Sequence, residues 1–136
     1  MPRLLREAPV NSIWEGSGNV NALDVLRALS REPESAEAFV AEVGTARGGD
    51  PRFDAAFDAL RRDMTDLSDA EFRARRLVER LAVVLQASLL IRYAPPPVAD
   101  AYCATRLAGE GGQTFGTLPS GLDLAPILER STPKLG

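Results

Sequence analysis

The stretch from Asp69 to Tyr93 constrains the fold most, because it predicts a single helix that is long for so short a chain. The pattern Ser68-Asp-Ala-Glu71 forms a capping box at its start, and at 1.5 Å per residue the helix extends roughly 36 Å. Its second half, from Leu81 to Ile91, is apolar on all sides. Such a helix has to be covered by other helices or by a partner subunit. The sequence therefore predicts an all-α helical bundle with this helix near its centre.

Shorter helices are predicted around it from apolar spacing and from helix-start and helix-stop residues. Leu23, Leu26 and Leu29 share one face of a helix that starts after Gly18 and ends before Pro33. Asp50-Pro51 has the form of an N-cap followed by a proline in the first turn. No strand pattern or internal repeat stands out, and residues 2–17 are predicted to be an ordered loop that includes a short helical turn. The remaining helices are expected at about 34–43, 51–64, 97–107 and 118–130.

Composition excludes several classes of function. The 136 residues carry 16 basic and 19 acidic side chains, a net charge of −3, so no overall basic footprint for nucleic acid or anionic membranes exists. The absence of histidine excludes His-based triads and His metal sites. Cys103 is the only cysteine, which fits a reducing compartment. No secretory signal or membrane span is recognisable, so we expect a cytoplasmic protein.

The segment with the clearest chemistry is Ile13-Trp-Glu-Gly-Ser-Gly-Asn19. Glu15 lies between the bulky Trp14 and the flexible Gly16, just before a predicted helix. A carboxylate against an apolar wall has a raised pKa and can exchange a proton near neutral pH. Backbone N–H groups at the following helix start could hold an anion. The alternative is structural: a glutamate at a helix start complements the dipole, and tryptophan is commonly a core residue.

This segment, with Arg6-Glu-Ala-Pro-Val-Asn11 before it, resembles the C-terminal signature of the acyl-CoA dehydrogenase superfamily. The version found here, followed by Leu-Asp-Val-Leu-Arg-Ala-Leu29, looks most like the branch of adaptive-response DNA alkylation proteins. The likeness is dense over residues 2–29 and thinner at 93–103. It implies that residues 1–32 end the C-terminal helical domain of the dehydrogenase fold, and that residues 33–136 form a helical C-terminal extension.

The resemblance also implies roles for individual residues. Glu15 matches the base that removes the α-proton of an acyl-CoA substrate while FAD accepts a hydride. Trp14 matches an aromatic wall of the flavin and acyl pocket. Gly16, Ser17 and Asn19 match positions close to the cofactor, although threonine is commoner than serine at position 17. The superfamily's other domains hold most flavin contacts, so we expect this chain alone to be inactive and to retain no FAD. The family also implies a homo-oligomer.

A competing interpretation is a non-catalytic interaction module that serves oligomerisation or weak, non-specific binding of double-stranded DNA. The resembled branch binds DNA through its C-terminal region, and Arg73, Arg76 and Arg80 share one face of the long helix. Interleaved acidic residues, with pairs such as Glu71–Arg75, favour a solvated and salt-bridged surface instead. No metal site is predicted, and Cys103 is expected to be a small core residue.

Overall fold

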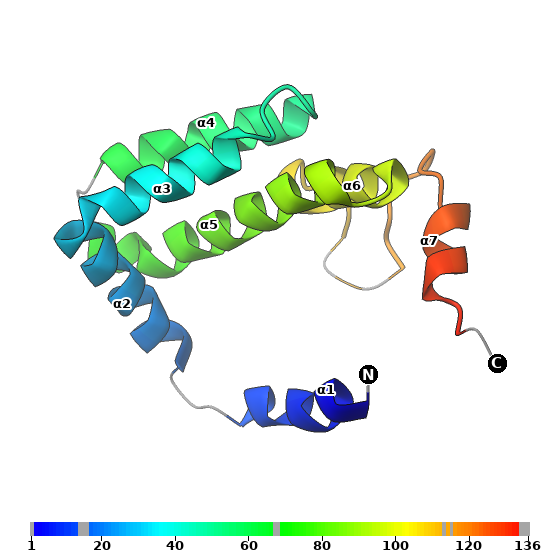
Figure 1. Cartoon of the computed structure of the whole chain (residues 1–136), viewed down its shortest axis with the longest axis horizontal. Helices are drawn as coiled ribbons and strands as arrows, with labels where there is room; N and C mark the ends of the chain where they lie inside the picture. Colours follow the sequence, from blue (N-terminus) through cyan, green and yellow to red (C-terminus); the bar gives the residue numbers. More distant parts are fainter. Residues whose placement is uncertain (1, 14–16, 67–68, 113, 115, 134–136) are drawn as a thin grey trace.

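Helix α5, Ala70–Tyr93, is the longest of the described helices and contacts most of the others (Figure 1). The computed structural model describes residues 2–13, 17–66, 69–112, 114 and 116–133. All regular elements in these ranges are helical, as predicted: α1 (Pro2–Glu7), the 3₁₀ turn η1 (Ala8–Ser12), α2 (Ser17–Arg31), α3 (Pro33–Gly44), α4 (Pro51–Thr65), α5, α6 (Pro96–Tyr102), the π-turn η2 (Cys103–Leu107) and α7 (Ala125–Ser131). None of these helices is long and apolar enough to cross a membrane.

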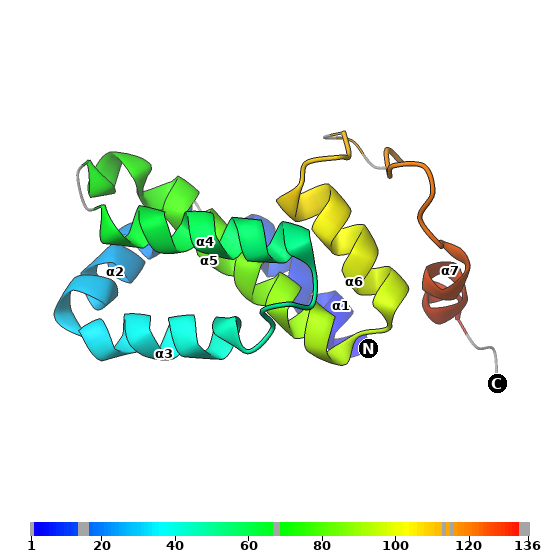
Figure 2. The ribbon, with the colours of Figure 1, turned by 90° about the horizontal axis from the view of Figure 1, so that it is seen from above.

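The core lies where α3 and α4 pack along one side of α5 (Figure 2). Phe53 and Phe57 of α4 are buried and stacked, with 5.8 Å between their ring centroids. Their spacing of four residues places both on the face of α4 that meets α5. From α5, buried residues follow at helical spacing, so the amphipathic patterns predicted from the sequence form this core. Its buried members are Val43, Ala46, Phe53, Phe57, Leu60, Leu77, Leu81, Val84, Ala87 and Cys103.

The apolar half of α5 is covered on only one side by the described residues. Leu89 and Tyr93 keep 40% and 75% of their surface exposed, and Ala82 and Gln86 are exposed as well. These four residues follow the spacing of a single helical face. The prediction that this half is surrounded is therefore not fulfilled within the described chain. A face of α5 remains available to other polypeptide.

The predicted capping box at the start of α5 includes Ser68, which lies outside the described residues, so it stays a prediction. The helix begins at Ala70, within one residue of the predicted start. Asp69 has a left-handed backbone with φ 52° and makes no side-chain capping bond. A capping side chain normally requires an extended backbone at the cap residue, so Asp69 does not cap the helix through its carboxylate.

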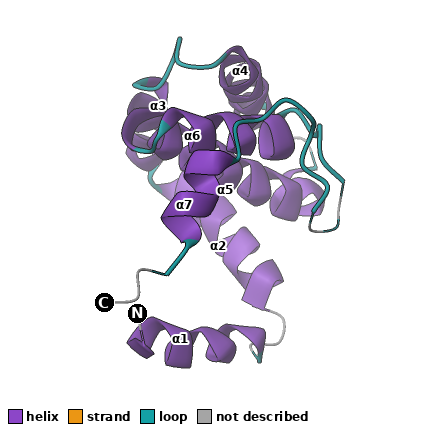
Figure 3. Ribbon diagram, turned by 90° about the vertical axis from the view of Figure 1, so that its right-hand side faces the viewer, coloured by secondary structure: helices purple, strands orange, loops and turns teal. Residues whose placement is uncertain are grey.

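Residues 2–12 of the N-terminal segment are helical, which is more helix than the short turn predicted within the loop. Pro9 lies in the first turn of η1, where no intrahelical hydrogen bond requires its missing N–H group. The turn-forming residues of this segment therefore allow helical structure. Arg3 and Glu7 form an exposed ion pair one turn apart on α1. Two views at right angles to each other place α1 away from the cluster formed by α3 to α6 (Figures 1 and 3). Its Leu4 and Leu5 are 66% and 77% exposed.

The predicted N-cap of α4 is confirmed. An Asp50 carboxylate oxygen accepts hydrogen bonds from the backbone N–H groups of Arg52, at 2.8 Å, and Phe53, at 3.4 Å. The Arg52 guanidinium also bridges the carboxylates of Asp50 and Asp100, each at 2.6 Å. This bridge ties the start of α4 to α6. The hydrogen bond from Arg52 is the main cause of a lowered pKa of the Asp50 carboxyl.

The lowered pKa gives a testable pH dependence. A carboxyl whose pKa is depressed by folding stabilises the protein above its unfolded pKa, and this stabilisation is lost as the pH falls through the folded pKa. Asp50→Asn keeps a capping acceptor but not the charge, so its unfolding free energy should fall less than that of the wild type between about pH 6 and about pH 3. Asp50→Ala should cost about 1 kcal/mol at neutral pH. Urea denaturation at each pH measures both effects, and identical pH profiles for wild type and Asp50→Asn would contradict the assignment.

The C-terminal third confirms two predicted helices. The helix expected at 97–107 consists of α6 and the π-turn η2, in which the Ala108 N–H donates to the Cys103 carbonyl at 3.0 Å. The one expected at 118–130 is restricted to α7. Helix α7 contacts α6 (Figure 3).

Candidate functional site

The predicted site lies at the N-terminus of α2. Trp14, Glu15 and Gly16 fall outside the residues that the structure describes. Ser17 is the first residue of α2 and is half-buried, and Asn19 is exposed in the first turn. Within the described residues α2 begins at Ser17, two positions after the predicted base in the sequence. Its first N–H groups and its dipole make this end of α2 favourable for negative charge.

The long helix of the predicted extension contacts this site. One Arg75 guanidinium nitrogen donates to the side-chain oxygen of Asn19 at 3.4 Å. A Cβ atom added to Gly18 would lie 3.4 Å from the other terminal nitrogen of the same guanidinium. Arg75 therefore adds a positive charge beside the start of α2. The side chain points to α2 and not to Glu71, the partner suggested by the sequence, and no local signal could reveal a contact across 56 residues.

Packing of α2 on α5 holds this arrangement in place. Ala22 is 1% exposed, and Val25, Leu26 and Leu29 pack against the core. The predicted stripe is therefore confirmed for Leu26 and Leu29, whereas Leu23 is 43% exposed and Val20 is 59% exposed. The site end of α2 consequently carries an apolar outer side that the described residues do not cover.

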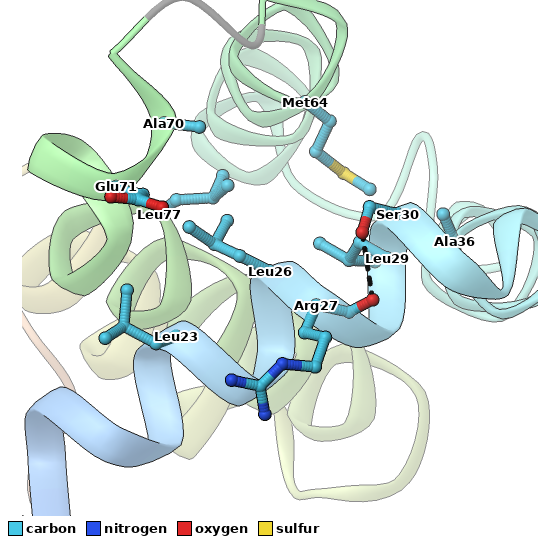
Figure 4. A pocket seen from close by; sticks show the side chains of 10 residues that line it. All are labelled: Leu23, Leu26, Arg27, Leu29, Ser30, Ala36, Met64, Ala70, Glu71 and Leu77. Atoms are coloured by element: carbon cyan, nitrogen blue, oxygen red, sulfur yellow. Dashed lines mark hydrogen bonds between the residues drawn. The ribbon is translucent and has the colours of Figure 1, made fainter.

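A hollow of about 480 Å³ opens between α2, α3, α4 and α5 (Figure 4). Its wall is mostly apolar, and Arg27 and Glu71 lie at its rim. Arg27 is paired with Asp24, and the Ser30 hydroxyl donates to the Arg27 carbonyl at 3.0 Å. Neither Ser17 nor Asn19 lines this hollow, so it is separate from the predicted site. The lining residues are Leu23, Leu26, Arg27, Leu29, Ser30, Ala36, Met64, Ala70, Glu71 and Leu77.

The described residues fit a flavin cofactor only as one edge of a binding site. Ser17 offers a hydroxyl and Asn19 an amide, both of which can hydrogen-bond to a polar ring edge. Neither of these two residues lines the hollow at α2 or the two further hollows along α5. An aromatic ring system needs a concave site that buries most of its surface. The remaining walls of such a site have to come from other residues.

The arginines predicted to contact DNA are partly neutralised. Arg73 donates to the backbone carbonyl of Asp66 at 2.6 Å and pairs with its carboxylate at 3.6 Å. Arg80 pairs with Asp63 of α4. Arg76 is exposed. These pairs agree with the salt-bridged surface that the interleaved acidic residues favour, and DNA binding stays a prediction.

Cys103 and the acidic residues offer no further catalytic centre. The thiol is 0% exposed, and burial is the main reason that its pKa is raised to about 11. Cys103 is therefore a core residue, as predicted. A thiol this hard to ionise is also a poor nucleophile. Within the described ranges, no group of three or more His, Cys, Asp or Glu side chains could hold a metal ion.

Comparison with known proteins gives the class. No family model matches the chain. It is 40% identical over 116 residues to a protein of Escherichia coli (strain K12) described as "Putative acyl-CoA dehydrogenase AidB". The predicted resemblance to the acyl-CoA dehydrogenase superfamily is thereby confirmed for the chain as a whole. Within that class its similarity is to AidB; the match covers 82% of this chain and 20% of that protein. The chain thus spans about a fifth of the length of the curated relative it matches.

Proposed function

We propose that this chain is the C-terminal part of an FAD-dependent, acyl-CoA dehydrogenase-like oxidoreductase in which Glu15 is the catalytic base. One observation carries the proposal. The Trp-Glu-Gly-Ser motif ends at Ser17, the first residue of α2, in a chain 40% identical to an acyl-CoA dehydrogenase-like protein. The polar start of α2, with Arg75 beside it, supports a site for anionic groups at this position.

The proposed chemistry follows from the motif residues. Glu15 would take the proton from the carbon next to the thioester carbonyl, whose acidity the carbonyl increases. Trp14 would keep water away from the carboxylate and so raise its pKa toward neutrality. Gly16 would permit the turn into α2, and Ser17 and Asn19 would hydrogen-bond to the cofactor. When bound, FAD supplies the acceptor for the hydride that leaves the neighbouring carbon.

Exposed apolar side chains support the proposal that this chain packs against further polypeptide. Leu5 of α1, Val20 of α2 and Tyr93 of α5 are 77%, 59% and 75% exposed. A helix as short as α1 is not stable in water without packing contacts. Domains that precede this segment in the longer relative, or a second subunit of a homo-oligomer, would bury these surfaces.

The proposal predicts that the 136-residue chain by itself binds no FAD. After incubation with excess FAD and gel filtration, we expect no visible flavin absorption in the protein peak. A longer protein that contains this chain preceded by dehydrogenase domains should retain the band through the same procedure. A stoichiometric flavin band on the short chain would show that its own residues complete the site, which contradicts the proposed division of contacts.

A further inference from the structure

Besides the hollow at α2, a groove lies between α4, α5 and the π-turn η2. Its volume is about 340 Å³, within the range of about 300–1,000 Å³ that is usual for sites of small ligands. Its floor is apolar: Val84 is 2% exposed, and Val83 and Leu107 are half-buried. The lining residues are Ala56, Ala59, Arg76, Glu79, Arg80, Val83, Val84, Arg106 and Leu107.

Positive charge surrounds this apolar floor. Arg76 and Arg80 come from α5 and Arg106 comes from η2, against the single carboxylate of Glu79. The Arg80 guanidinium is held by Asp63. Within the described structure Arg76 and Arg106 are exposed and form no ion pair. Two guanidinium groups at the rim are therefore available to an anionic group, which they can bind through paired hydrogen bonds.

The π-turn brings residues of two elements together at this groove. Cys103 and Ala104 are 0% and 1% exposed and anchor the inner side of η2 in the core. The wider turn, closed by the bond from Ala108 to Cys103, shifts the following residues relative to a regular α-helix. Arg106 and Leu107 lie within this turn, and both line the groove. Single π-turns inside helices are frequent at functional sites.

We propose that this groove binds a small amphipathic anion. A carboxylate or phosphate head would lie between Arg76 and Arg106, and an apolar body would cover Val83, Val84 and Leu107. This inference does not depend on the proposed dehydrogenase function, because no motif residue lines the groove. The larger hollow at α2 is a poorer candidate, since its arginine is already paired with Asp24 and Glu71 lies on the same rim. A nucleic-acid backbone is also disfavoured, because the apolar floor gives nothing to sugars and phosphates.

The test is a titration of the ¹⁵N-labelled 136-residue chain with octanoate, octyl phosphate and 1-octanol, followed by two-dimensional NMR. Octanoate or octyl phosphate should shift the amide signals of residues 76–84 and 103–108. Neutral octanol should bind at least about tenfold more weakly, because it lacks the charge-assisted bonds to arginine. Preference for the carboxylate or for the phosphate identifies the head group.

Paired charge reversals locate the site. Arg76→Glu with Arg106→Glu should weaken binding of the preferred anion by about tenfold or more. Arg61→Glu with Arg62→Glu changes the net charge equally on exposed α4 residues outside the groove and should leave the affinity unchanged. Dispersed NMR spectra of both double variants confirm that each is folded.

Several results would overturn the proposal. These are shifts confined to the hollow lined by Leu26 and Met64, equal affinity for octanoate and octanol, equal loss in both double variants, or no shifts at millimolar ligand. A duplex DNA titration provides the last arm. If Arg76→Glu with Arg106→Glu abolishes DNA binding while neither anion shifts the groove residues, these arginines serve a phosphate backbone and the small-ligand proposal is wrong.

Discussion

Replacing Phe53 with alanine is expected to lower the free energy of unfolding by about 3–5 kcal/mol. The Phe53 ring is fully buried and stacks on Phe57 at the centre of the contact between α4 and α5. Truncation removes the transfer free energy of the ring and leaves a cavity between α4, whose start is fixed by the Asp50 cap, and α5. For a domain of this size such a loss is a large part of the total stability.

Phe72→Ala is the matched control for this prediction. The two changes are chemically identical, but Phe72 of α5 is 93% exposed in this chain. A substitution on such a surface normally changes stability by no more than about 0.5 kcal/mol. Guanidinium denaturation followed by circular dichroism measures both variants. Equal destabilisation by the two substitutions would show that the core is not organised around α4 and α5 as described.

Helix patterns were predictable where a single helix buries one clear face. In α4 the Asp50-Pro51 start and the spacing of Phe53, Phe57 and Leu60 determine both the beginning of the helix and its buried side. These signals are local, because capping bonds and helical spacing involve residues close in sequence. The helical class of the fold follows from the same patterns repeated along the chain.

Features that depend on distant residues were not predictable. The contact of Arg75 with Asn19 joins two helices that no sequence pattern connects. An all-apolar run indicates that burial is needed, by other helices or by a partner subunit, but not that the face at Leu89 and Tyr93 is the one left exposed. Helix α1 over residues 2–7 is longer than the short helical turn that was predicted, because turn-forming residues nearby dominate the local pattern.

The sequence alone names the residues of the candidate site, but it does not give their arrangement in space. The motif places Glu15 one turn before Gly18 and Asn19, and the structure begins α2 at Ser17. Family resemblance supplies the roles of Trp14, Glu15 and Gly16, which lie outside the described residues. The positive charge of Arg75 near this site comes only from the folded arrangement.

The central claim is that Glu15 is the base of an acyl-CoA dehydrogenase-like reaction, and Glu15→Gln tests it most directly. The amide has nearly the same shape as the carboxylate but cannot accept the α-proton. In the longer protein that contains this chain, the rate of acyl-CoA oxidation should fall by about 10²–10⁴-fold. Flavin absorption should stay at the wild-type level, because the substitution removes a proton acceptor and not the cofactor site.

Glu37→Gln is the control. Glu37 is exposed on α3 and lies outside the motif, the hollow at α2 and the groove at η2. The decisive measurement is the rate of acyl-CoA-dependent dye reduction by the three flavin-loaded proteins. The account predicts a wild-type rate for Glu37→Gln and a loss of at least about a hundredfold for Glu15→Gln. A Glu15→Gln protein that oxidises acyl-CoA as fast as the wild type would contradict it.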